Sequence, residues 1–84
     1  MSHQIGPITS TEHGTSYWIR NAEDVRAVTV SGGKCSIRRA GSEIRLDVDI
    51  VDCAPVPGHG IRPRNPITVE LGLEGKKKET LVLA

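Results

Sequence analysis

The sequence predicts an all-β domain, either a small antiparallel barrel or a two-layer sandwich of five to six strands. Two glycine-containing turns bring apolar positions of neighbouring segments into register. The segment 44–50 alternates apolar and polar residues, which is typical of a strand with one solvated face. No segment carries a helical apolar stripe over about three turns. Residues 1–84 are long enough for one small domain, which we expect them to form.

The N-terminal part contributes an arm and the first clear strand. Residues 1–14 contain scattered Gly and Pro and are predicted to be an extended arm, which becomes a sixth strand if residues 5–9 pair. Residues 15–20 are β-branched and aromatic, which favours a strand. Neighbouring residues on a strand face opposite ways, so one of Tyr17 and Trp18 should enter the core and the other be partly exposed. Residues 21–24 are interpreted as a turn.

The middle of the chain predicts two consecutive hairpins. A two-residue turn at Gly32-Gly33 would set Val30 opposite Cys35 and Val28 opposite Ile37. A second turn at Gly41-Ser42 would set Ile37 opposite Leu46 and Arg38 opposite Arg45. Together the two turns predict one apolar sheet face, consisting of Val28, Val30, Cys35, Ile37, Ile44, Leu46, Val48 and Ile50.

Residues 54–66 are predicted to be a long irregular loop. Four of these thirteen residues are Pro and two are Gly, and each Pro removes a backbone donor. The segment also carries His59, Arg62 and Arg64. Arginine binds carboxylate or phosphate in a fork, so the loop is a candidate partner-binding or anion-binding segment. The alternative is a solvated connector.

The C-terminal part predicts a hairpin formed by residues 67–73 and 80–83. Turn chemistry favours a two-residue loop at Gly75-Lys76. Side-chain parity instead favours a three-residue loop that sets Val69 opposite Leu81 and Ile67 opposite Leu83. The sequence leaves both registers open.

Charge and apolar content indicate where the protein resides and what it can attract. The sequence has eleven Lys and Arg and ten Asp and Glu, a balance that gives no strong electrostatic attraction to nucleic acid or an anionic membrane. No apolar run of about 18 residues or signal-peptide core is present, so we expect a cytoplasmic protein without membrane insertion. In that compartment Cys35 and Cys53 are expected as free thiols rather than a bridge.

The predicted function is a non-enzymatic protein-interaction or assembly module. No metal-ligand spacing, cofactor motif or acid–base pair is found, so no metal, cofactor or catalytic residue is predicted. One Trp, one Tyr and no Phe leave a small aliphatic core, which favours a homo-oligomer formed through sheet edges or exposed aromatics. The candidate partner-binding residues are Tyr17, Trp18, His59, Arg62 and Arg64.

The alternative function is binding of nucleic acid or another anionic ligand. It would use a local basic surface rather than the overall charge. The candidate anion-binding residues are Arg38, Arg45, Lys76, Lys77 and Lys78.

Overall fold

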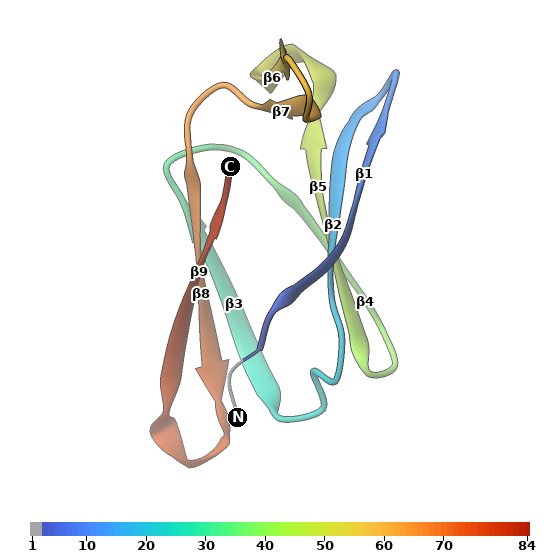
Figure 1. Ribbon diagram of the computed structural model, residues 1–84. Coiled ribbons are helices and arrows are strands. Elements are labelled where there is room, and N and C mark those ends of the chain that lie inside the picture. The colour runs from blue at the N-terminus through green and yellow to red at the C-terminus, as the bar shows by residue number, and fades with distance from the viewer. Residues whose placement is uncertain (1–2) are drawn as a thin grey trace.

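Two antiparallel sheets pack face to face in residues 3–84, the part of the chain that this computed structural model describes (Figure 1). The all-β prediction is confirmed as a sandwich, because the sheets do not close into a barrel. The strands are β1 (Ile5–Thr11), β2 (Gly14–Ile19), β3 (Val25–Ser31), β4 (Ser36–Ala40), β5 (Glu43–Asp49), β6 (Cys53–Val56), β7 (Gly60–Pro63), β8 (Ile67–Leu73) and β9 (Lys78–Leu83). Two short 3₁₀ turns, η1 (Ile50–Asp52) and η2 (Glu74–Lys76), complete the elements.

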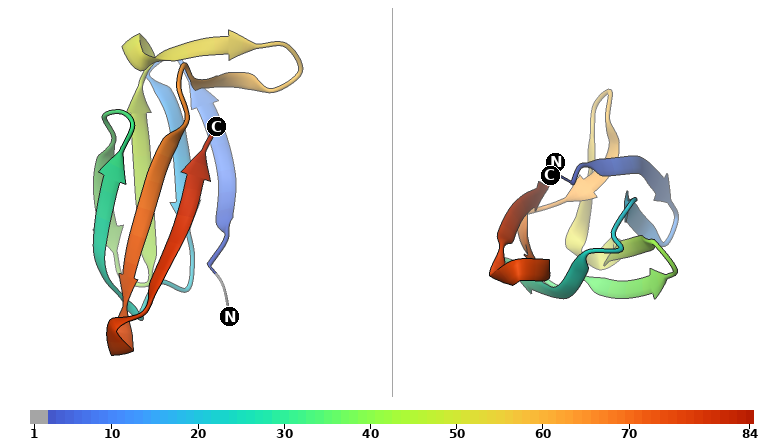
Figure 2. Two further views of the ribbon diagram at one scale, coloured as in Figure 1. Left: turned by 90° about the vertical axis from the view of Figure 1, so that its left-hand side faces the viewer. Right: turned by 90° about the horizontal axis from the view of Figure 1, so that it is seen from below.

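The strand order is that of a seven-strand immunoglobulin constant-type sandwich. One layer has the order β1-β2-β5-β4 and the other β3-β8-β9, while β6 and β7 form a separate hairpin between β5 and β8 (Figure 2). The chain changes layer after β2, after β3 and on the way from β5 to β8. Such sandwiches carry many unrelated functions, so the topology establishes the architecture alone.

The core lies between the inner faces of the two sheets. The alternation of β5 buries Ile44, Leu46 and Val48, as the sequence predicts. Strand β8 in the facing layer also alternates, and it buries Ile67, Val69 and Leu71 in the core. The buried apolar residues are Tyr17, Ile19, Ala22, Val25, Ile44, Leu46, Val48, Cys53, Ile67, Val69, Leu71 and Leu83.

The two predicted central hairpins have different outcomes. The Gly41-Ser42 turn is confirmed, with Ile37 opposite Leu46 and Arg38 opposite Arg45. The Gly32-Gly33 hairpin is wrong, because β3 pairs with β8 and the chain crosses to the other layer before β4. Gly32 is needed there for close approach: at φ +88°, a Cβ would lie 2.9 Å from the Pro66 carbonyl oxygen.

The predicted apolar face is consequently divided between two layers. Val28 lies opposite Leu71 and Val30 opposite Val69 in one sheet, whereas Ile37 belongs to the other. Val28 and Val30 meet apolar residues in either arrangement, since the predicted hairpin offers Ile37 and Cys35 and β8 offers Leu71 and Val69. Ile50 is a further correction, because it begins η1 instead of continuing β5.

The N-terminal arm and segment 54–66 both form strands. Within the predicted arm, β1 pairs with β2, which gives the additional strand that the sequence left open. Residues 54–66 are not an irregular loop, because β6 and β7 form a hairpin closed by the His59 N–H donating to the Val56 carbonyl at 2.9 Å. A two-stranded hairpin leaves one side of each strand unpaired, which accommodates proline.

The β8–β9 hairpin has the register favoured by side-chain parity. Ile67 lies opposite Leu83 and Val69 opposite Leu81. The Leu73 N–H donates to the Lys77 carbonyl at 2.8 Å, which leaves a three-residue loop. In residues 3–84 no helix is long and apolar enough to cross a membrane.

Candidate functional site

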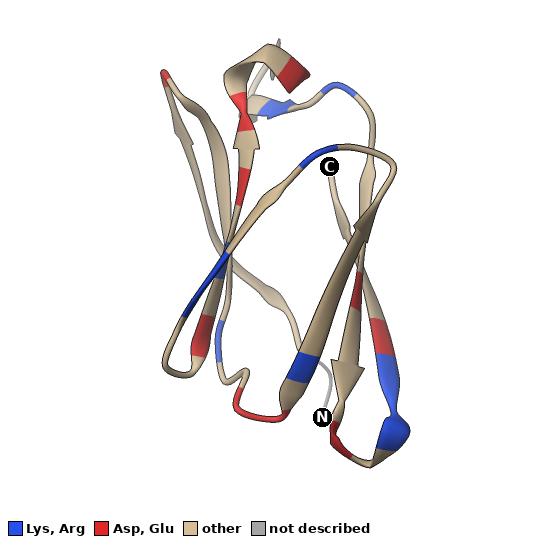
Figure 3. Ribbon diagram, turned by 180° about the vertical axis from the view of Figure 1, so that it is seen from behind, with Lys and Arg blue, Asp and Glu red and all other residues tan. Residues whose placement is uncertain are grey.

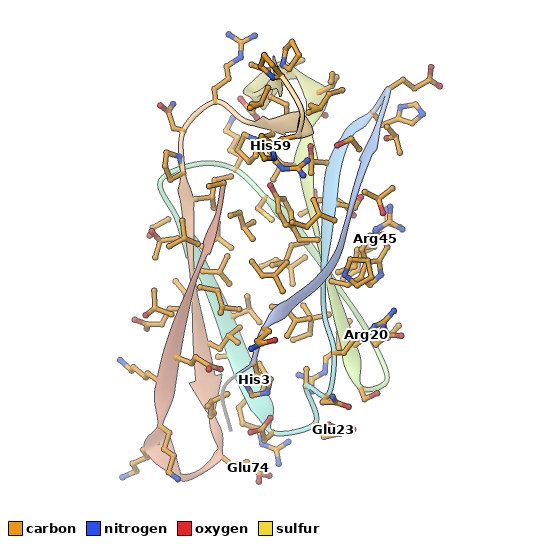
Figure 4. All side chains as sticks on the ribbon, in the orientation of Figure 1. His3, Arg20, Glu23, Arg45, His59 and Glu74 are labelled. Carbon is orange, nitrogen blue, oxygen red and sulfur yellow. The ribbon has the colours of Figure 1, made fainter. Side chains whose placement is uncertain are left out.

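Three side chains from neighbouring strands form a row on the outer face of the four-stranded sheet. Trp18 on β2 lies opposite Arg45 on β5, which lies opposite Arg38 on β4. Trp18 faces outward because its neighbour Tyr17 is fully buried, as strand alternation predicts. The Arg45 guanidinium carbon lies 5.2 Å from the centre of the Trp18 ring, within cation–π range. Figure 4 shows Arg45 on the side of the sheet away from the core.

The adjacent polar row holds Arg45 in position. Asp47 accepts a hydrogen bond from Arg45 Nε at 2.9 Å and another from the Ser16 hydroxyl at 2.5 Å. Arg45 Nη2 also donates to the Ser16 hydroxyl at 3.4 Å, so two groups hold the guanidinium. The Arg45 side chain is therefore fixed between an aromatic ring and a carboxylate.

Arg38 is the uncompensated cation of this face. Asp47 balances Arg45, and Glu43 lies 3.5 Å from Arg20 Nε. Within residues 3–84 Arg38 has neither an ion pair nor a side-chain hydrogen bond, although it faces Arg45 directly. A shallow cavity of about 270 Å³ lies over the row, lined by Trp18, Arg38, Ala40, Glu43 and Arg45. Its lining therefore holds two arginines and one glutamate.

The sheets also present unpaired strand edges, most of which carry features that discourage pairing. Strand β1 contains Pro7 and an irregular register between Ile5 and Ile8. Strand β9 carries Lys78 and Glu79 near one end. Strand β4 carries two adjacent arginines, Arg38 and Arg39.

Strand β3 is the exception among these edges. Arg26 and a register shift between Val25 and Ala27 lie at its start, but the run Ala27–Ser31 that follows is regular, pairs with β8 on one side only, and holds no charge or Pro. Val28 and Val30 are partly buried against the core at this side of the sandwich. A neutral, regular edge of this kind is a template for another strand.

The predicted partner-binding arginines of segment 54–66 make contacts within this chain. The Arg62 guanidinium donates to the Ile61 carbonyl at 2.9 Å and to the Ser10 hydroxyl at 3.2 Å. Arg64 Nε donates to the Cys53 carbonyl at 3.1 Å. Both arginines thus hold the β6–β7 hairpin in place, and His59 is exposed at its tip, as Figure 4 shows.

The predicted basic surface is divided in the structure. Lys76 and Lys77 lie in the β8–β9 turn and Lys78 begins β9, whereas Arg38 and Arg45 belong to the other sheet. Figure 3 shows these two basic groups on different parts of the molecule. Lys78 Nζ lies 3.7 Å from Glu70, so one lysine of the turn has an acidic neighbour.

A buried histidine cluster escapes prediction from the sequence. His3 is only 8% exposed, and its Nδ1 and Nε2 lie 2.6 Å from Glu79 and 2.9 Å from Asp24. Its backbone N–H also donates to both Glu79 carboxylate oxygens. No local pattern relates three residues this far apart in sequence.

The histidine cluster is an electrostatic clamp rather than a metal site. The two ring nitrogens point to two separate carboxylates, and no group of three potential ligands in residues 3–84 is suited to a metal. Burial lowers the pKa of His3, but the hydrogen bonds to Glu79 and Asp24 outweigh burial and raise it above its ordinary value.

Both cysteines are free thiols, as the sequence predicts. Cys53 is buried and Cys35 partly buried. Burial, together with the negative charge of Asp47, raises the pKa of the Cys35 thiol to about 11. The reactive thiolate is therefore scarce near neutral pH.

No protein-family model, curated protein or solved structure matches this chain.

Proposed function

We propose that this domain is a non-enzymatic assembly module whose copies pair through strand β3. The observation that supports this proposal is that the β3 edge differs in its residues from the edges of β1, β4 and β9. Strand β1 contains Pro7 and an irregular register, β9 carries Lys78 and Glu79, and β4 carries two arginines, whereas the five-residue run Ala27–Ser31 of β3 holds no Pro and no charge. An exposed regular edge without such protection favours addition of a further strand.

The side chains of β3 suit antiparallel pairing with a second copy. A pair centred on Thr29 would set Val28 opposite Val30 of the second copy on the inner face. On the outer face Thr29 would meet itself, and Ala27 would meet Ser31. No like charges meet in this register, and the two three-stranded sheets would become one six-stranded sheet.

Pairing would also cover apolar surface that one chain leaves partly open. Val28 and Val30 are only partly buried in the single chain. Their burial against a second copy would contribute about 25 cal/mol for each Å² of apolar surface removed from water. A domain with a small aliphatic core gains stability from such association.

Matched pairs of lysine substitutions test the assembly. Thr29 and Thr80 flank Glu70 on opposite edges of the same sheet, and Ser31 and Val82 flank Thr68 in the same way. The double variant T29K/S31K therefore adds charge to the β3 edge. The variant T80K/V82K adds equal charge, beside the same neighbours, to the β9 edge.

Sedimentation measures the oligomeric state of each protein at concentrations from about 5 to 200 µM, a range suited to a modest interface. We expect dimers of the wild type and of T80K/V82K, and dimerisation at least about tenfold weaker in T29K/S31K, since edge lysines oppose pairing. Circular dichroism checks that both variants fold. A wild type that stays monomeric throughout, or equal weakening in both variants, would refute pairing through β3.

A further inference from the structure

We infer that the outer face of the four-stranded sheet binds an extended acidic segment of another protein, which adds along the edge of β4 and places a carboxylate on Arg38. Two features of this edge carry the inference. The first is the free cation at Arg38, beside the fixed Arg45 and Trp18. The second is the unpaired side of β4, which ends the sheet order β1-β2-β5-β4.

A second copy of this chain is a poor occupant of the β4 edge. Antiparallel pairing of β4 with itself over all five residues would set Arg38 opposite Arg38 of the other copy. Arg38 already faces Arg45 on its other side in each copy, so four guanidinium groups would stand in one row. Like charges directly opposite each other destabilise strand pairing, whereas a carboxylate at this place would be stabilising.

The charges on this face favour a carboxylate in particular. Arg45 and Arg20 already have Asp47 and Glu43 as neighbours, so one positive charge remains uncompensated in the row. The fork of donors on a guanidinium matches the two oxygens of a carboxylate. The cavity of about 270 Å³ beside Trp18 and Arg38 leaves room for one such side chain, and its acidic lining residue, Glu43, is paired with Arg20.

The alternation of β4 also specifies the neighbours of that carboxylate. Ile37 points toward the inner layer, yet it remains 43% exposed at the open side of the sandwich. An added strand would place an apolar residue opposite Ile37, directly after the acidic residue opposite Arg38. Arg39 is already occupied, because it donates to the Val25 and Ala22 carbonyls at 2.6 Å. The expected segment is therefore polar, then acidic, then apolar.

A synthetic peptide gives a direct probe of this site. The peptide acetyl-Gly-Thr-Thr-Glu-Val-Thr-Gly-amide has the required order, and its Glu-to-Gln and Glu-to-Lys forms are the controls. Trp18 is the sole tryptophan of the chain, so its fluorescence reports occupation of the row. Amide NMR shifts then show whether the peptide lies along β4.

Two substitutions that each remove one positive charge distinguish binding at Arg38 from a general effect of the protein's charge. R38Q removes the uncompensated cation, and K77Q removes one exposed charge from the β8–β9 turn. We expect the Glu peptide to bind R38Q at least about fivefold more weakly than wild type, and K77Q as tightly as wild type. R38E should reject the Glu peptide and accept the Lys peptide.

Several results would overturn the inference. Equal binding of the Glu and Gln peptides, equal effects of R38Q and K77Q, or no binding at millimolar peptide would each do so. A thymidine oligonucleotide is tested in the same way. If it quenches Trp18 fluorescence in the wild type but not in R38Q, and the peptide has no effect, the row binds nucleic acid instead. The peptide titration is repeated on T29K/S31K, the variant in which pairing through β3 should be weakened. Peptide binding at β4 and assembly through β3 are thus tested separately, and either can fail while the other holds.

Discussion

His3 Nδ1 and Glu79 Oε1 lie 2.6 Å apart, although the two residues are separated by 76 positions in the sequence. The other ring nitrogen of His3 lies 2.9 Å from Asp24 Oδ1. One imidazole therefore joins the segment before β1 to β9 and to the β2–β3 connection. This contact links the two layers of the sandwich at the end marked by His3 in Figure 4.

The substitution His3→Gln tests the clamp. Loss of two charge-assisted hydrogen bonds at a buried site should lower the free energy of unfolding by about 2 kcal/mol. Urea unfolding at one fixed protein concentration measures the change. His13→Gln is the matched control, because the His13 side chain is 87% exposed and should leave the midpoint unchanged. An unchanged midpoint in His3→Gln would mean that the clamp adds no stability.

The stability of the domain should also fall as the pH rises through the raised pKa of His3. The protonated ring donates to Glu79 and Asp24, so its pKa in the folded state lies above the unfolded value of about 6.5. The stabilisation is then complete below about pH 6.5 and is lost as the pH rises through the folded-state pKa.

Urea unfolding at intervals between about pH 5.5 and 8.5 measures this dependence. We expect the wild type and His13→Gln to lose stability over this range by similar amounts. His3→Gln should have a flatter profile. A wild-type profile that rises with pH, or one that His3→Gln leaves unchanged, contradicts the assignment.

Removal of the Tyr17 hydroxyl should increase stability. The ring is fully buried in the core, and its oxygen has no hydrogen-bond partner among the residues described. A buried polar atom without a partner costs about 1–3 kcal/mol, so Tyr17→Phe should gain about 1 kcal/mol. Tyr17→Ala should instead lose about 4 kcal/mol, because it empties the space of the ring. Thermal unfolding compares the two variants, and a loss in Tyr17→Phe would reveal an undetected partner for the hydroxyl.

Gly14 should tolerate no side chain. Its φ is +136°, and a Cβ there would lie 1.9 Å from the Val48 carbonyl oxygen. Gly14→Ala should cost at least about 3 kcal/mol or prevent folding, since both strain and overlap oppose it. Gly41→Ala is the control, because Gly41 also has a positive φ, +62°, but open space around it. It should cost about 1 kcal/mol, and equal losses in the two variants would exclude the overlap as the cause.

The candidate site was predictable in part. Strand alternation predicts that Tyr17 and Trp18 face opposite ways, and the Gly41-Ser42 turn predicts that Arg38 meets Arg45. The contact between Trp18 and Arg45 requires the pairing of β2 with β5, which no turn connects. The sequence therefore indicated that these three residues were candidates for a binding site, but not that Trp18 lies beside the two arginines.

By itself, the sequence determined the local features of this protein. The alternation of β5 and its turn with β4 follow from side-chain period and backbone conformation over a few residues, whereas two loop lengths remained open for the β8–β9 hairpin. The tertiary structure decided the partner of β3, the β6–β7 hairpin and the meeting of His3 with Glu79. An apolar strand can pair with any other strand of the same period. The choice among such partners depends on the packing of both layers at once, which no short segment encodes.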